Sequence, residues 1–132
     1  DLDQVVTDLT GAAFGSAGER CMALPVVVPV GEETADRLRE KLIPAIEALR
    51  IGVSTDPDAH YGPVVTKAHK ERVEGYIQMC IDEGGELVVD GRGFTLQGNE
   101  EGFFIGPTFF DHVKPSFRSY QEEIFGPVLQ MV

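Results

Sequence analysis

The sequence predicts an α/β fold with a largely parallel sheet flanked by helices. Three long segments repeat apolar residues at i, i+3 and i+4, which is typical of helices with one buried face. Short β-branched or aromatic runs lie between and after them and read as strands. Strands separated by helices of about ten residues or more favour parallel pairing. With 132 residues, 42% of them hydrophobic, the chain can form one domain with a modest core.

The first half of the chain predicts a helix, a strand and a second helix. Residues 1–13 carry a buried stripe that ends before the small residues at 15–18. Residues 24–30 form an apolar, β-branched run that suits a strand covered on both faces, with Pro25 and Pro29 marking its ends. Residues 31–49 predict the second helix, in which Pro44 should cause a kink or break near Leu42.

The second half predicts a loop, a third helix and three strands. Residues 51–63 are rich in Gly, Asp and Pro and are typical of a surface loop. Thr66 can cap a helix that runs to about Glu83 and ends at Gly84. Strands are expected at 86–90, 103–113 and 124–132, and residues 114–123 should form a loop or short helix.

Composition narrows the possible partners. The net charge is −11, from 11 basic and 22 acidic residues, so nucleic acid and anionic membrane surfaces should be repelled. No apolar run reaches the roughly 18 residues of a membrane-spanning helix, and the first residues lack the features of a targeting signal. Only two cysteines are present, which favours a reducing compartment over a disulfide framework.

The histidines and cysteines do not predict a metal site. Their positions show none of the short spacings that bring ligands together: Cys21, Cys80, His60, His69 and His112. Cys80 falls on the apolar side of the third helix and should be a core residue. His60 and His112 lie in loop-like surroundings and His69 on the expected polar side of its helix, so we expect all three to be solvated rather than to act as bases.

Cys21 is the first candidate for chemistry. It follows the small residues Gly15-Ser16-Ala17-Gly18, which let the backbone turn sharply and let a ligand approach. A thiolate at such a turn would be a nucleophile. The alternative is that Cys21 is a small buried hydrophobe. Arg20, directly before it, has a planar guanidinium that suits a ligand carboxylate.

A second candidate segment is Glu122-Glu123-Ile124-Phe125-Gly126-Pro127. In isolation its two glutamates would be solvated loop carboxylates. A carboxylate can also accept a pair of ribose hydroxyls, as acidic residues do in dinucleotide sites. Gly126-Pro127 should form a turn that fixes their orientation.

These two segments together resemble the aldehyde dehydrogenase superfamily. Residues 14–22 (FGSAGERCM) are similar to its nucleophile segment, and residues 122–128 (EEIFGPV) to its second marker. The finer patterns at 11–23, 61–67 and 102–108 resemble the methylmalonate-semialdehyde dehydrogenases within it. The resemblance covers nearly all of 1–132. It implies one partial domain, the cysteine-bearing part of an aldehyde dehydrogenase catalytic domain, with most of the dinucleotide-binding domain absent.

The resemblance also implies roles. Cys21 would be the nucleophile, Arg20 would bind the substrate carboxylate, Glu123 would hold the nicotinamide ribose and Phe125 would lie beside the nicotinamide. The cofactor would be NAD, and coenzyme A would be the co-substrate. The parent enzyme would convert methylmalonate or malonate semialdehyde to propionyl-CoA or acetyl-CoA.

Further expectations concern the parent protein and the alternatives to this function. The parent would be a homo-oligomer, a dimer or tetramer, in the cytoplasm of a bacterium or the mitochondrial matrix of a eukaryote. This chain alone should be inactive, because parts of the active site are missing. The alternatives are an NAD-dependent aldehyde dehydrogenase that releases a free acid, and a noncatalytic α/β scaffold with an inert Cys21.

Overall fold

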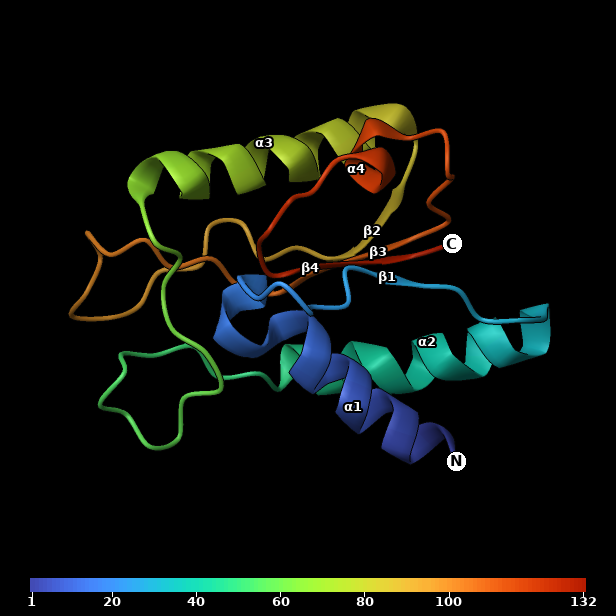
Figure 1. Ribbon diagram of the computed structural model, residues 1–132. Coiled ribbons are helices and arrows are strands. Elements are labelled where there is room, and N and C mark those ends of the chain that lie inside the picture. The colour runs from blue at the N-terminus through green and yellow to red at the C-terminus, as the bar shows by residue number, and fades with distance from the viewer.

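A four-stranded sheet lies between two layers of helices (Figure 1). The computed structural model describes residues 1–132. The strands are β1 (Val26–Val27), β2 (Glu86–Val89), β3 (Thr108–Asp111) and β4 (Val128–Met131), in the order β1-β4-β3-β2. β4 pairs in parallel with both β1 and β3, and β2 is an antiparallel edge strand. The predicted α/β fold with a largely parallel sheet is confirmed.

The helices begin and end close to their predicted bounds. They are α1 (Leu2–Phe14), α2 (Glu32–Glu47), α3 (Lys67–Glu83) and the short α4 (Arg118–Gln121). The Thr66 side chain caps α3 by accepting a hydrogen bond from the His69 N–H at 3.0 Å, and Gly84 ends that helix in the left-handed conformation. Pro44 lies in the last turn of α2 and does not break it. α1 and α2 cover one face of the sheet, and α3 and α4 the other (Figure 1).

The strands are shorter than the sequence predicts. β1 contains two half-buried residues at the edge of the sheet, so the expectation of a strand covered on both faces is wrong. Val28 and Val30, which continue the same apolar run, are 61% and 89% exposed. The strand predicted at 103–113 is reduced to β3, and before it the Phe103 carbonyl accepts from the Val64 N–H while the Gly106 N–H donates to the Gly91 carbonyl.

The core fills both sides of the sheet. Its largest fully buried side chains come from helices and strands alike: Phe14, Leu42, Ile46, Ile77, Phe109, Phe110 and Leu129. Cys80 is buried as predicted, and its burial raises the pKa of the thiol. None of the helices combines the length and the apolar character needed to cross a bilayer.

Candidate active site

The turn that leads to Cys21 has an unusual backbone. After α1, the short segment Gly15–Gly18 (η1) places Ser16, Ala17 and Gly18 at φ values of 53°, 55° and 71°. Left-handed conformation costs a residue other than glycine about 1 kcal/mol or more, so Ser16 and Ala17 carry backbone strain here that Gly18 does not. The turn reverses the chain and presents Cys21 at the surface of the molecule. The predicted sharp turn before the cysteine is confirmed.

Gly18 joins the two candidate segments. A Cβ atom at Gly18 would lie 2.1 Å from the carbonyl oxygen of Gly126, a distance that no side chain tolerates. The backbone of the cysteine turn therefore packs directly against the backbone of the Glu123–Pro127 segment. Gly126 is in turn packed against Val73 of α3, where an added Cβ would lie 2.6 Å from a methyl carbon. Gly18 and Gly126 thus allow the cysteine turn, the Glu123–Pro127 segment and α3 to pack together.

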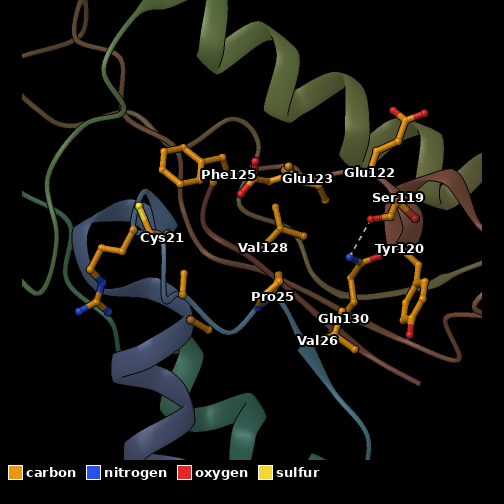
Figure 2. Close-up of a pocket in the computed structure, with 16 residues that line it drawn as sticks. Cys21, Pro25, Val26, Ser119, Tyr120, Glu122, Glu123, Phe125, Val128 and Gln130 are labelled. Carbon is orange, nitrogen blue, oxygen red and sulfur yellow. Dashed lines mark hydrogen bonds between the residues drawn. The ribbon is translucent and has the colours of Figure 1, made fainter.

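One cleft contains all four residues that the sequence analysis selected. Cys21, Arg20, Glu123 and Phe125 line it. Figure 2 draws Cys21 and the Phe125 ring toward one end of this cleft and Gln130 and Ser119 toward the other. The first and last thirds of the sequence therefore supply a single concave site, the usual setting for a small-molecule ligand.

Cys21 is exposed, so in this chain it is not the buried hydrophobe of the alternative interpretation. Its N–H group donates to no backbone or side-chain acceptor. The Arg20 guanidinium donates to the Gly11 carbonyl at 2.6 Å through Nη2. This bond uses one of the five guanidinium N–H groups and fixes the side chain against the last turns of α1.

The two adjacent glutamates have different surroundings. Glu122 accepts hydrogen bonds from the Tyr76 hydroxyl at 2.7 Å and from Arg118 at 2.9 Å. Both bonds lower the pKa of Glu122, and the Tyr76 bond has the larger effect. The Glu123 carboxylate makes no hydrogen bond or ion pair within the chain, and the residue is exposed on the cleft. Of the two, Glu123 is therefore the carboxylate that is free to bind a ligand.

One face of α3 holds the Glu122–Gly126 segment in place. His69, Arg72, Val73 and Tyr76 all contact it, at the i, i+3, i+4, i+7 spacing of a helix face. His69 Nε2 lies 2.6 Å from the carbonyl oxygen of Phe125, and its side chain is only 16% exposed. The expectation that His69 is solvated is therefore wrong. The mixture of polar and apolar side chains on this face of α3 is the sequence signal that could have identified His69 as a contact residue.

Glu19 connects the cysteine turn to the same helix. Its side chain is 9% exposed, and its carboxylate lies 3.9 Å from His69 Nε2. Burial raises the pKa of Glu19, against the opposing effects of His69 and the Val65 N–H. Glu19 was not among the candidate residues, because an acidic residue in a glycine-rich turn reads as solvent-exposed.

The remaining histidines lie outside the cleft. His60 is exposed and accepts a hydrogen bond from the Arg50 N–H, and His112 is 73% exposed. His112, Glu86 and Asp111 form the one group of potential metal ligands within 4.8 Å of one another. The Arg39 guanidinium already binds both carboxylates, at 2.6 and 2.7 Å, so we interpret the group as an ion-pair network.

The fold and the cleft define an α/β protein with an accessible cysteine beside an unpaired carboxylate. Residues 1–132 match the model of the aldehyde dehydrogenase family, and the chain belongs to that family. This finding confirms the resemblance on which the sequence analysis relied.

Two known relatives of this chain carry the names of semialdehyde dehydrogenases. The chain is 53% identical to malonate-semialdehyde dehydrogenase of Pseudomonas aeruginosa, over the whole chain and 27% of the relative. It is 45% identical over 129 residues to the acylating, mitochondrial methylmalonate-semialdehyde dehydrogenase of Arabidopsis thaliana, covering 98% of the chain and 21% of the relative.

A solved structure in complex with NAD has the same fold. It comes from Sinorhizobium meliloti 1021 and is described as a methylmalonate-semialdehyde dehydrogenase. Its TM-score is 0.98 at 57% identity, and the match covers all of this chain and 27% of that one. The chain thus spans about a quarter of the length of these relatives.

Proposed function

We propose that this chain is the cysteine-bearing part of a longer NAD-dependent dehydrogenase that oxidises malonate or methylmalonate semialdehyde and transfers the acyl group to coenzyme A. The observation that carries the proposal is the cleft that Cys21, Arg20, Glu123 and Phe125 share. The names of the P. aeruginosa, A. thaliana and S. meliloti relatives support the substrate class. The word acylating in the plant enzyme's name supports coenzyme A.

The proposed reaction begins at Cys21. Its thiolate attacks the aldehyde carbon, and the carbonyl π electrons move to the oxygen to give a thiohemiacetal. The unpaired N–H of Cys21 can donate to this oxyanion, in the manner of an oxyanion hole. Loss of hydride from the former aldehyde carbon leaves a thioester on Cys21.

The residues present fit one part of NAD. Glu123 offers a carboxylate without an internal partner, which can accept two ribose hydroxyls. Phe125 offers a half-buried ring on the same cleft, against which a nicotinamide could pack. NAD, when bound, supplies the hydride acceptor. The elements that bind the rest of the dinucleotide are expected in the part of the polypeptide outside this chain.

The acyl group on Cys21 then has two possible fates. In the proposed function the carboxylate of the substrate is lost as carbon dioxide or bicarbonate, and the thiol of coenzyme A takes the acyl group from Cys21. In the alternative, water hydrolyses the thioester and a free acid leaves. Assays of the full-length protein with and without coenzyme A separate the two: the proposal requires acyl-CoA product, and its absence together with free acid would support the alternative.

Arg20 is the proposed determinant of substrate class. One guanidinium N–H is held by Gly11, which orients the fork and leaves other N–H groups for a carboxylate. Losing such a contact costs about 2 to 5 kcal/mol when the partner charge is buried. Arg20→Ala in the full-length protein should therefore reduce kcat/KM for malonate semialdehyde about 30-fold or more, and far less for propanal.

Arg37→Ala is the matched control, because Arg37 is 62% exposed on α2 and lies outside the cleft. This variant should leave both rates unchanged. Equal losses for the acidic and the neutral aldehyde in Arg20→Ala would show that Arg20 does not recognise the carboxylate.

A noncatalytic scaffold is the remaining alternative. Cys21 is exposed in either case, and the two functions differ in whether its thiol is activated. Iodoacetamide at neutral pH distinguishes the two, because an activated cysteine reacts much faster than an ordinary exposed thiol. The buried Cys80 serves as an internal control that should resist modification.

A further inference from the structure

His69 occupies a position that the proposed chemistry does not yet use. It lies in the first turn of α3 and contacts segments from both ends of the sequence. Nε2 is 2.6 Å from the Phe125 carbonyl oxygen and 3.9 Å from a Glu19 carboxylate oxygen. His69 therefore lies between the turn that carries Cys21 and the segment that carries Glu123.

The chemistry of the hydrogen bond fixes the role of Nε2. A carbonyl oxygen can only accept a hydrogen bond, so Nε2 must carry the imidazole proton and donate the hydrogen bond to the Phe125 carbonyl oxygen. The imidazole also meets the Phe125 ring edge-on, with ring centres 6.4 Å apart and planes inclined by 63°. His69 thus holds both the main chain and the side chain of one residue.

Phe125 is a residue that needs such support. Its φ is 58°, in the left-handed region that a bulky side chain rarely adopts. Strained backbone of this kind persists only where the surroundings fix it. Here the supports are the His69 hydrogen bond to Phe125, the Gly126 backbone packed against Val73, the Tyr76 hydrogen bond to Glu122, and a long 3.4 Å contact from Arg72 to the Glu123 carbonyl.

We propose that His69 is a positioning residue that fixes the Glu123–Phe125 segment in the geometry in which it binds the cofactor. This inference rests on the proposed function. The His69 hydrogen bond is the one among these supports that holds Phe125 itself. The Tyr76 bond holds Glu122, the long Arg72 contact holds the Glu123 carbonyl, and the apolar Val73 contact lies at Gly126. Without the bond, Phe125 can relax toward negative φ and carry the Glu123 carboxylate away from the cleft.

The test compares three substitutions in the full-length protein. Gln places an amide nitrogen near the position of Nε2, whereas Asn places one near Nδ1 and Leu provides no donor. We expect His69→Leu and His69→Asn to raise the KM and the dissociation constant for NAD about tenfold, as for the loss of one hydrogen bond, with kcat changed less than threefold. His69→Gln should stay within about threefold of the natural protein.

Glu71→Leu is the matched control on α3, because Glu71 is exposed and makes no side-chain bond in the structure. It should leave NAD binding unchanged. If His69→Leu does not fold, the comparison of Gln with Asn still decides the matter. Equal NAD affinity in the Gln and Asn variants, or unchanged affinity in the Leu variant, would overturn the inference.

The same measurements separate this inference from the proposed function. If the natural protein reduces NAD with a semialdehyde and the His69 variants bind NAD normally, only the positioning role is wrong. If the natural protein binds NAD but oxidises no aldehyde, the proposed function is wrong, and the dissociation constants still test His69. If it binds no NAD, both are wrong.

Discussion

At the scale of single residues, small size is as important as reactivity. Cys21 supplies the chemistry, but Gly18 decides where it lies relative to Glu123, because the two backbones touch at Gly18 and Gly126. A methyl group at position 18 would meet both a left-handed φ of 71° and a carbonyl oxygen. Relaxing the φ angle or moving the Gly126 carbonyl away would displace one side of the cleft.

We therefore expect Gly18→Ala to reduce kcat/KM of the full-length protein about a hundredfold, because small displacements of reacting groups cost this much. Gly98→Ala is the matched control. Gly98 also has a positive φ, of 83°, but an added Cβ there would meet nothing within 4 Å. Equal losses of kcat/KM in the two variants would show that backbone strain, and not the contact with Gly126, causes the loss.

The two adjacent glutamates give a second prediction. Glu123→Gln should raise the KM for NAD roughly 10- to 100-fold, since a hydrogen bond to a charged group is worth about 1.5 to 3 kcal/mol. Glu122→Gln should change it little, because the side chain at this position binds Tyr76 and Arg118 and the amide oxygen of Gln can still accept the Tyr76 hydrogen bond. Steady-state kinetics at varied NAD concentration measure both KM values. A larger increase for Glu122→Gln would contradict the assignment of Glu123 as the ribose-binding carboxylate.

The sequence could supply the residues of the site but not their supports. Cys21, Arg20, Glu123 and Phe125 were selected from motifs, and the structure places all four on one cleft. His69 was wrongly expected to be solvated, because helical periodicity alone does not say which loop will cover a polar face. Glu19 was missed because an acidic residue in a glycine-rich turn reads as exposed, whereas its burial depends on α3, about 50 residues further along the chain.

At the scale of elements, the helices were more predictable than the strands. A long apolar stripe and a capping Thr66 define α3 almost to the residue. Strand limits depend on partners that the sequence does not name. The apolar run at 24–30 looks the same whether it lies at the edge or in the centre of a sheet, and only the structure shows that β1 is an edge strand.

Arg39 links α2 to the opposite edge of the sheet, where it binds Glu86 of β2 and Asp111 of β3. Arg39→Met should lower the stability of the full-length protein at pH 7 by about 1 to 3 kcal/mol, because Asp111, with its side chain 9% exposed, loses its charged partner. The hydrogen bond from Arg39 also lowers the pKa of Glu86 below its ordinary value of 4.5.

The direction of this pKa shift sets the pH dependence. The contribution of Glu86 is fully present above pH 4.5 and is lost as the pH falls through its lower folded-state pKa. The difference in melting temperature between the natural protein and Arg39→Met should therefore be largest near neutral pH and shrink in acid. A difference that grows in acid would contradict this account of the ion-pair network.

At the scale of the whole molecule, the chain is one α/β unit in which both candidate segments meet at one cleft. Its net charge of −11 is unfavourable for anionic cofactors. This fits the proposal that the phosphate-binding elements lie elsewhere in a longer polypeptide. The cleft itself holds the reacting sulfur and the carboxylate proposed to hold the ribose.

The most direct test of the central claim is mass spectrometry of the full-length protein mixed with NAD and malonate semialdehyde in the absence of coenzyme A. We predict a malonyl or acetyl thioester on the peptide that contains Cys21, removed when coenzyme A is added. NADH formation with Cys21 unmodified, or full activity in Cys21→Ala, would contradict the account.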